Sequence, residues 1–217
     1  MRKGGHLAAA IVATVLAALV ISACGAPAYT YVTNSAAHTY FKVPRTWQKI
    51  DSKELAKAIS GGATLPPSVW TVGYDASSNP AAQDVLSPKA KKPFAYAVVE
   101  QVNEQTSSIL SYNLLRDFFL PVTSDARQTA AKDGFSLTGF RLIRSSVLTP
   151  GQGFHGVRET FDYTYPDGSQ NTFDQVALTN ADSTEVYVLL VHCLATCYNS
   201  DANQIDSVMK SFTVRSS

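Results

Sequence analysis

The sequence has little net charge. Its 217 residues include 18 basic and 17 acidic side chains, a formal net charge of +1, and only 16% of the residues are charged. Loss of residues 1–23 would remove two basic side chains and leave 16 against 17, a formal charge of −1. Binding to the phosphate backbone of DNA or RNA requires clustered positive charge. We therefore expect no nucleic-acid partner.

The sequence also lacks a complete catalytic motif. It has no G-x-S-x-G segment, which marks the nucleophile of α/β hydrolases. Residues 151–156 match G-x-G-x-x-G, but dinucleotide binding needs a strand before this motif and a helix after it. Here Pro150 precedes the motif and a strand-like run follows, so a turn between strands is expected. Ser207 and Lys210 have S-x-x-K spacing without the downstream elements of penicillin-recognising enzymes. We expect no enzymatic activity, no cofactor and no metal site.

Four polar residues on one predicted strand are the remaining catalytic candidates. With a period of two, Arg158 and Asp162 lie on one face of the strand, and His155 and Glu159 on the other. An acid–base pair is one interpretation. Cross-strand ion pairing on a half-solvated face is the commoner role of such residues, and we favour it. His38 has no partner that the sequence indicates.

Long apolar runs are absent except near the N-terminus. Arg2 and Lys3 precede an uncharged apolar run at 7–20, and small residues follow it. This layout is typical of a secretory signal peptide. The run is shorter than the roughly 20 apolar residues that a membrane-spanning helix needs.

The segment Ile21-Ser22-Ala23-Cys24 ends this region. It resembles the lipobox of bacterial lipoproteins, in which the cysteine thiol receives diacylglycerol and becomes the mature N-terminus. The resemblance implies a signal peptide at 1–23, lipidation of Cys24, and a lipid anchor at the extracytoplasmic face of the cell membrane. Ordinary secretion with cleavage near residues 26–28 is the alternative.

Cysteine is scarce, and the number of cysteines is odd. There are three, and an unpaired thiol is unusual in an exported protein. If Cys24 carries lipid, Cys193 and Cys197 remain as a pair, and a disulfide is their natural state in an oxidising compartment. A redox pair is an alternative, although redox motifs usually have two intervening residues rather than three. A metal site with His192 is disfavoured because neighbouring strand residues point to opposite faces.

The rest of the chain alternates between strand and helix patterns. Strands are expected at 39–43, 69–74, 94–102, 135–148, 157–165, 172–178, 185–193 and 212–214. Helices are expected at 51–60, 107–119, 123–133 and 201–210. Residues 24–37 are predicted as the lipidated N-terminus and tether, and residues 76–93 as a long exposed loop. Hairpin-linked strands and one-faced helices predict an α+β fold, an antiparallel sheet flanked by helices in a single domain at 38–217.

Two short segments carry a family resemblance. Phe41-Lys42-Val43-Pro44 with Trp47 opens the domain, and a helix with Ile205 and Val208 leads into Ser211-Phe212 at its end. This combination resembles the PsbP-like α/β/α sandwich, and actinobacterial cell-envelope lipoproteins of the LpqN type look similar in their lipobox and tether. The resemblance implies a non-enzymatic adaptor or extrinsic subunit and transfers no catalytic residue.

These observations predict a lipid-anchored envelope protein that works by binding. We expect an accessory subunit of an envelope assembly, whose partners are the membrane, through its anchor, and other envelope proteins. The alternative is a carrier or sensor of an apolar ligand, such as a lipid, held between sheet and helices. That function requires a pocket of about 300 Å³ or more. Aromatic residues that could line it are Phe161, Tyr163, Tyr165, Phe173 and Tyr187.

Overall fold

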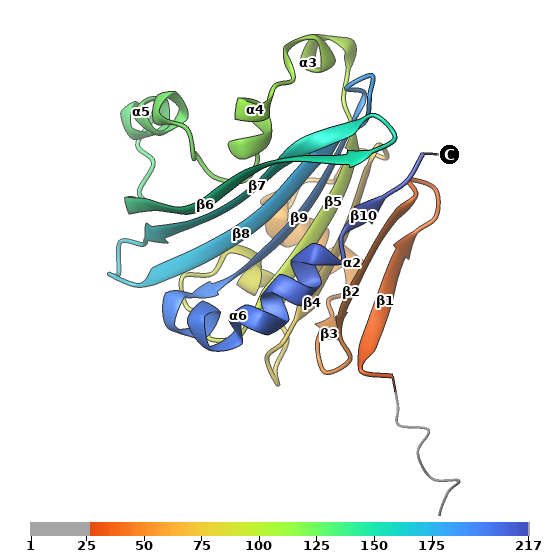
Figure 1. Cartoon of the computed structure of the whole chain (residues 1–217). Coiled ribbons are helices and arrows are strands. Elements are labelled where there is room, and N and C mark those ends of the chain that lie inside the picture. The colour runs from red at the N-terminus through yellow and green to blue at the C-terminus, as the bar shows by residue number, and fades with distance from the viewer. Residues whose placement is uncertain (1–26, 217) are drawn as a thin grey trace, which may run out of the picture.

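The computed structural model describes residues 27–216, which form two antiparallel sheets (Figure 1). The larger sheet contains β3 (Gln48–Lys49), β4 (Val69–Asp75), β5 (Phe94–Gln101), β6 (Thr138–Gly151), β7 (Phe154–Thr164), β8 (Gln170–Thr179) and β9 (Glu185–Leu194). Their order across the sheet is β3-β4-β5-β9-β8-β7-β6. The smaller sheet contains β1 (Tyr29–Asn34), β2 (Thr39–Pro44) and β10 (Thr213–Val214), in the order β1-β2-β10.

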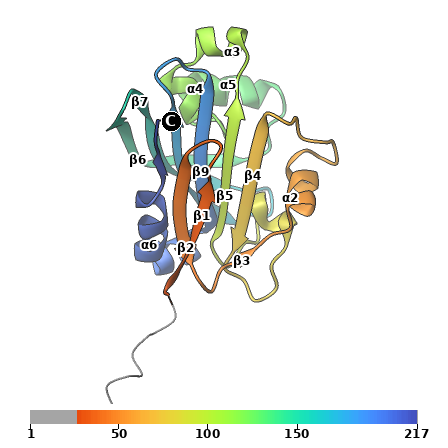
Figure 2. The ribbon, with the colours of Figure 1, turned by 90° about the vertical axis from the view of Figure 1, so that its right-hand side faces the viewer.

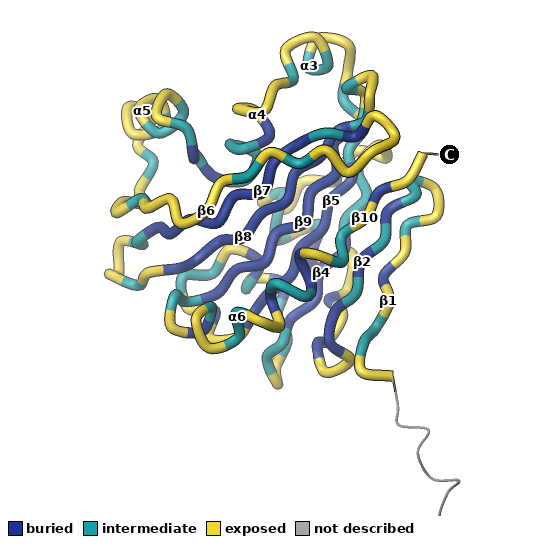
Figure 3. The backbone as a smooth tube through the Cα atoms, viewed as in Figure 1, coloured by how far each residue is buried: buried dark blue, intermediate teal, exposed yellow. Residues whose placement is uncertain are grey.

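The strand β9 lies in the middle of the larger sheet because its side chains are apolar on both faces. It pairs with β5 on one side and β8 on the other, and residues 186–193 are all buried (Figure 3). A strand covered on both faces requires an almost continuous apolar run. Short turns join β6 to β7, β7 to β8 and β8 to β9, as the turn residues between these strands predict.

One face of the larger sheet is covered by helix α6 (Ala195–Lys210) and by the smaller sheet (Figure 2). We call it the α6 face. Ile205 and Val208 of α6 pack in one apolar cluster with Phe41 of β2 and with Leu189 and Val191 of β9. This cover is continuous over the central strands.

The opposite face is covered by several short elements, and we call it the α2 face. Helix α2 (Ser52–Ile59), the 3₁₀ helix η1 (Ala82–Leu86) and helix α4 (Tyr112–Arg116) contact it. Helices α3 (Glu104–Ile109) and α5 (Ser124–Lys132) flank α4 (Figure 1). Helices on both faces of an antiparallel sheet confirm the predicted α+β class.

Capping residues predicted the start of α2. The Asp51 carboxylate accepts hydrogen bonds from the backbone N–H groups of Lys53 (2.9 Å) and Glu54 (3.1 Å). These bonds satisfy two of the donors that the first turn of a helix leaves free. Leu55 then lies fully buried against the sheet.

The predicted tether at 24–37 requires a correction, because residues 29–34 form β1. This strand pairs with β2 over its whole length, from Tyr29 opposite Pro44 to Asn34 opposite Thr39. Only Val32 of β1 is buried, so the apolar alternation that identifies a strand is weak. The pairing with β2 creates this strand, and its local sequence hardly signals it.

Two predicted helices also differ from the structure. The helix expected at 107–119 is replaced by α3 and α4, whose N-caps are Asn103 and Ser111, because Leu110 adopts an extended conformation. The last helix begins at Ala195 instead of 201, after an N-cap residue, Leu194, whose side chain makes no capping bond. No capping residue announces this start in the sequence.

The segment 76–93 is not simply an exposed loop. It contains η1, and its residues Ala82, Val85 and Ala90 are buried. Spaced apolar residues among Ser, Pro and Lys therefore cover one end of the larger sheet.

The predicted signal peptide and the lipobox residues Ile21, Ser22, Ala23 and Cys24 lie outside the described residues. None of the helices within residues 27–216 combines the length and the apolar character that a membrane span requires.

Candidate functional site

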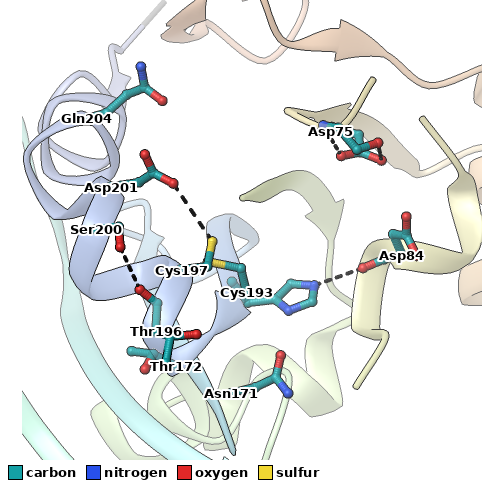
Figure 4. Close-up of a disulfide and its surroundings, with 12 residues drawn as sticks. Asp75, Asp84, Asn171, Thr172, Cys193, Thr196, Cys197, Ser200, Asp201 and Gln204 are labelled. Atoms are coloured by element: carbon teal, nitrogen blue, oxygen red, sulfur yellow. Dashed lines mark hydrogen bonds between the residues drawn. A yellow bond between two sulfur atoms is a disulfide. The ribbon is translucent and has the colours of Figure 1, made fainter. Parts of the chain in front are cut away.

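The two cysteines near the end of β9 form a disulfide. Cys193 and Cys197 are bonded, with Cα atoms 6.0 Å apart. The bond joins the C-terminal end of β9 to the first turn of α6 (Figure 4). Both residues are buried in a small cluster with Ala90. The bond closes a loop of a few residues at the exit from the sheet, which is a structural role.

His192 faces away from the disulfide, as the alternation of strand residues predicts. Its Nε2 donates to the carbonyl oxygen of Asp84 at 3.0 Å, and its ring stacks on Phe173 with the ring centroids 5.3 Å apart. Complete burial lowers the pKa of His192 to about 4. Within residues 27–216 no three His, Cys, Asp or Glu side chains are grouped as metal ligands.

Arg158, Glu159 and Asp162 of β7 are buried, which corrects the expected half-solvated face, whereas His155 is half-buried and its ring packs edge-on against Tyr112. Arg158 donates to both carboxylate oxygens of Asp174, at 2.9 and 2.8 Å, and also pairs with Asp206 at 3.0 Å. These contacts lie on the α6 face. The contact between Arg158 and Asp174 is a cross-strand ion pair of the kind expected, but it is buried, and the contact with Asp206 joins the strand to α6.

Glu159 lies on the α2 face of the same strand. Its Oε1 accepts from the Arg116 Nε and the Ser145 hydroxyl, each at 3.0 Å. Burial raises the pKa of Glu159, and the bonds from Ser145 and Arg116 oppose this shift. Asp162 instead bonds Thr172 and Arg141. The structure thus distributes these residues among separate clusters and brings no acid–base pair together in the described part of the chain.

The glycine-rich segment is a turn, as its sequence context predicts. Gly151 and Gly153, with φ values of 100° and 81°, lie where β6 turns into β7. Between them Gln152 also has a positive φ of 56°. The S-x-x-K residues lie on α6, where Lys210 pairs with Asp206 at 2.7 Å.

An open pocket of about 610 Å³ on the α2 face is the strongest candidate site. Its floor is formed by β4 and β5, one wall by α2, the opposite wall by Phe118 and Phe119 after α4, and one end by η1. The lining residues are Ala58, Ile59, Leu65, Pro66, Val69, Gln83, Val85, Leu86, Tyr96, Val98, Glu100, Phe118 and Phe119. Its volume lies in the range of about 300–1,000 Å³ that is typical of small-molecule sites.

Few polar groups face this pocket. The Tyr96 side chain is only 4% exposed, and its hydroxyl makes no hydrogen bond with another described residue. Burial raises the pKa of Tyr96, and the negative charge of Glu100 adds to the shift, so the phenol is neutral at physiological pH. Glu100 forms no ion pair with a described residue. These two side chains therefore have bonding capacity left for a ligand.

A second hollow, of about 380 Å³, lies at the margin of the α6 face. Residues 147–150, Arg158, Met209, Lys210 and Phe212 contribute to its lining. Its two cations already pair with Asp206, at 3.0 and 2.7 Å. This hollow therefore offers less unused bonding capacity than the pocket on the α2 face.

The aromatic residues proposed from the sequence do not line the main pocket. Phe161, Tyr163 and Phe173 pack together further along the α2 face, and Tyr187 packs against Phe154 on the α6 face. The Tyr165 hydroxyl bonds the carbonyl oxygen of Leu86 at 2.8 Å. The pattern that could have indicated the pocket is on β5, where alternate residues change from Phe94 through Tyr96 and Val98 to Glu100. A ring, a hydroxyl and then a carboxylate on one face are unusual for a sealed core.

Comparisons with known proteins connect the chain to known structures only. No family model matches it, and no curated protein matches it. The solution structure of cyanobacterial PsbP (CyanoP) from Synechocystis matches with a TM-score of 0.53 and 12% identity, over 89% of this chain and 96% of that one.

Two further solved structures are less similar. The Ran-binding protein Mog1p of Saccharomyces cerevisiae matches with a TM-score of 0.45 and 11% identity, over 86% of this chain and 95% of that one. LpqN of Mycobacterium tuberculosis matches with a TM-score of 0.40 and 13% identity, over 87% and 91%. At this level of identity the likeness to CyanoP shows the fold alone, and these two structures add nothing to it. The fold is PsbP-like, as the opening and closing segments of the domain suggest.

Proposed function

We propose that this protein is a lipid-anchored, non-enzymatic binding protein at the extracytoplasmic face of a bacterial cell membrane. The signal-peptide layout and the Ile21–Cys24 segment support this location and the lipid anchor. The disulfide between Cys193 and Cys197 is consistent with an oxidising compartment.

The pocket on the α2 face carries the binding part of the proposal. It is large enough for a small ligand, and its walls are mostly aliphatic and aromatic. Burial of apolar area contributes about 25 cal/mol per Å², so such walls favour an apolar ligand. The function that this geometry supports best is that of a carrier or sensor of an apolar ligand.

A role as an accessory subunit of an envelope assembly is the second candidate, and the edge strand β6 favours it. Leu142, Ile143 and Val147 of this strand are 48%, 47% and 55% exposed. Exposed apolar side chains on a sheet edge are typical of a protein–protein contact. Crosslinking in intact envelopes, with Val147→Lys as the variant, tests this role; an unchanged crosslinking pattern would count against β6 as the contact.

The anchor is tested by Cys24→Ala. The variant should accumulate as an unlipidated precursor, because lipidation and processing both require the thiol. Membrane fractionation and intact mass measure this outcome. The double variant Cys193→Ala/Cys197→Ala is the matched control and should remain lipidated. Release of a normal-sized mature protein from cells with Cys24→Ala would contradict the anchor.

The pocket is tested by Ala58→Phe, which places a ring into it from α2. Displacement of an environment-sensitive apolar dye from the lipidated protein in nanodiscs reports occupancy, after subtraction of empty nanodiscs. Ala58→Phe should abolish saturable dye binding. Ala56→Phe, on the same helix but outside the pocket lining, is the control. Equal binding by both variants would remove the carrier function.

A further inference from the structure

We propose that this pocket selects an amphiphile whose head group is a protonated amine, and that Glu100 is the residue that binds the head. The inference rests on the proposed binding of an apolar ligand and adds the chemistry of its polar end. It follows from the placement of the polar groups and from the charge of the lining.

Two of the three polar lining residues lie on one strand, and the third, Gln83, lies on η1. Tyr96, Val98 and Glu100 occupy alternate positions of β5, so their side chains share the α2 face. The strand register places Glu100 opposite Val69 of β4 and Val186 of β9. Both cross-strand neighbours are aliphatic, and neither offers a hydrogen bond to the carboxylate. Glu100 is therefore a carboxylate at the edge of an apolar surface.

The charge of the lining has a single sign. Of the thirteen lining residues, Glu100 is the only acid, and none is Lys, Arg or His. An amine head brings the opposite charge and donors that the carboxylate lacks, and charge-assisted hydrogen bonds are about twice as strong as neutral ones. A carboxylate or phosphate head would meet an uncompensated like charge. The pocket thus favours a cation over a neutral head, and a neutral head over an anion.

Tyr96 supplies a second polar contact deeper in the floor. Its hydroxyl has no partner among the described residues and keeps some contact with the open pocket, so a ligand can bond it. It is an uncharged donor and acceptor, so it can bond an amine or a hydroxyl equally well. Head-group selectivity therefore comes from Glu100, and Tyr96 adds affinity without selectivity.

Three probes with one chain length separate these contributions. Octylamine, octanol and octanoate at pH 7 differ only in a positive, neutral or negative head. Each is titrated against the dye-loaded lipidated protein in nanodiscs, with empty nanodiscs subtracted. Octylammonium should bind about tenfold more tightly than octanol, which corresponds to about 1.4 kcal/mol, and octanoate should bind more weakly than octanol.

Glu100→Gln keeps the shape of the side chain and removes its charge. It should reduce the preference for octylammonium over octanol to about twofold or less. Glu104→Gln, on α3 outside the pocket, is the matched control and should keep the preference. Tyr96→Phe should weaken the binding of octylammonium and the binding of octanol by a similar factor.

The outcomes distinguish this inference from the proposed function. Equal binding of all three probes to the native protein, or a preference retained in Glu100→Gln, overturns the role of Glu100 while leaving an apolar site. Failure of every probe to displace the dye, octanol included, overturns the apolar site itself.

Discussion

The two faces of the larger sheet are both apolar, yet they are closed in different ways. On the α6 face one helix of 16 residues and a three-stranded sheet form a continuous cover. On the α2 face the cover consists of α2, with eight residues, and of η1 and α4, with five each. The gap between these short elements becomes the pocket. Continuity of the covering elements therefore decides whether an apolar surface is sealed or left open.

The side chains of β5 match this difference. Ala95, Ala97 and Val99 face the α6 side and are small, so the smaller sheet packs closely on them. Tyr96 and Val98 face the α2 side together with the larger residues of the strand. Small residues allow close approach of a second layer, whereas large ones hold the short helices apart.

The largest predicted effect comes from one substitution made on both faces. Ile205→Ala on α6 should lower the free energy of unfolding by about 4 kcal/mol, because the side chain is fully buried and leaves a cavity. Ile59 on α2 lines the pocket and is only partly buried. Ile59→Ala should therefore lower the free energy of unfolding by roughly 1 kcal/mol. Urea unfolding of both variants measures the difference. Equal losses would mean that the α2 face is as tightly packed as the α6 face.

The second prediction uses His192, which lies at the sealed end of the α2 face. Its folded pKa is lowered to about 4, against about 6.5 in an unfolded chain. The unfolded state therefore binds more protons between these values, and the free energy of unfolding falls as the pH falls from 6.5 to 4. The free energy of unfolding has then fallen by about 3 kcal/mol at pH 4, relative to its value at neutral pH.

His192→Gln removes this dependence while keeping a donor for the Asp84 carbonyl. The native protein should exceed the variant in stability at pH 7, and the difference should shrink by about 3 kcal/mol at pH 4. Urea unfolding at the two pH values measures it. A difference that stays constant would show that folding does not lower the pKa of His192.

The third prediction concerns the disulfide at the end of the α6 face. Cys193→Ala/Cys197→Ala should lower the free energy of unfolding by about 2 kcal/mol, because the bond closes only a short loop. In the exported native protein, both thiols should resist alkylation until they are reduced. Modification of either cysteine before reduction, detected by mass spectrometry, would contradict the bond.

Sequence patterns correctly predicted the elements that short stretches of sequence determine. Asp51 predicted the start of α2, and turn residues predicted the hairpins of the larger sheet. The sequence patterns failed where contacts with a distant part of the chain determine the structure. The strand β1 depends on pairing with β2, and α6 begins early where Leu194 donates its N–H to the carbonyl oxygen of Ala90.

The pocket was beyond sequence reasoning for a similar reason. Its floor comes from β4 and β5, and its walls come from α2, η1 and the segment after α4, which are distant in the chain. The sequence indicated a space between sheet and helices, but the aromatic residues that it offered belong to sealed clusters. Which apolar residues remain uncovered depends on the lengths of the covering elements.

The smallest predicted effect compares two buried tyrosines on opposite faces. Tyr187 donates its hydroxyl to the Glu185 carboxylate at 2.5 Å, whereas the Tyr96 hydroxyl has no partner among the described residues. Tyr187→Phe should therefore lower the free energy of unfolding by about 1 kcal/mol. Tyr96→Phe should change it by less than about 0.5 kcal/mol, or raise it, because no bond is lost.

Thermal and urea unfolding of the two variants, without ligand, measure this difference. A loss for Tyr96→Phe equal to that for Tyr187→Phe would mean that the Tyr96 hydroxyl is already bonded in the free protein. Tyr96 would then offer no bond to a ligand, and Glu100 would remain the only charged side chain of the lining that can recognise the head. A neutral result leaves the hydroxyl free for a ligand, as an open α2 face requires.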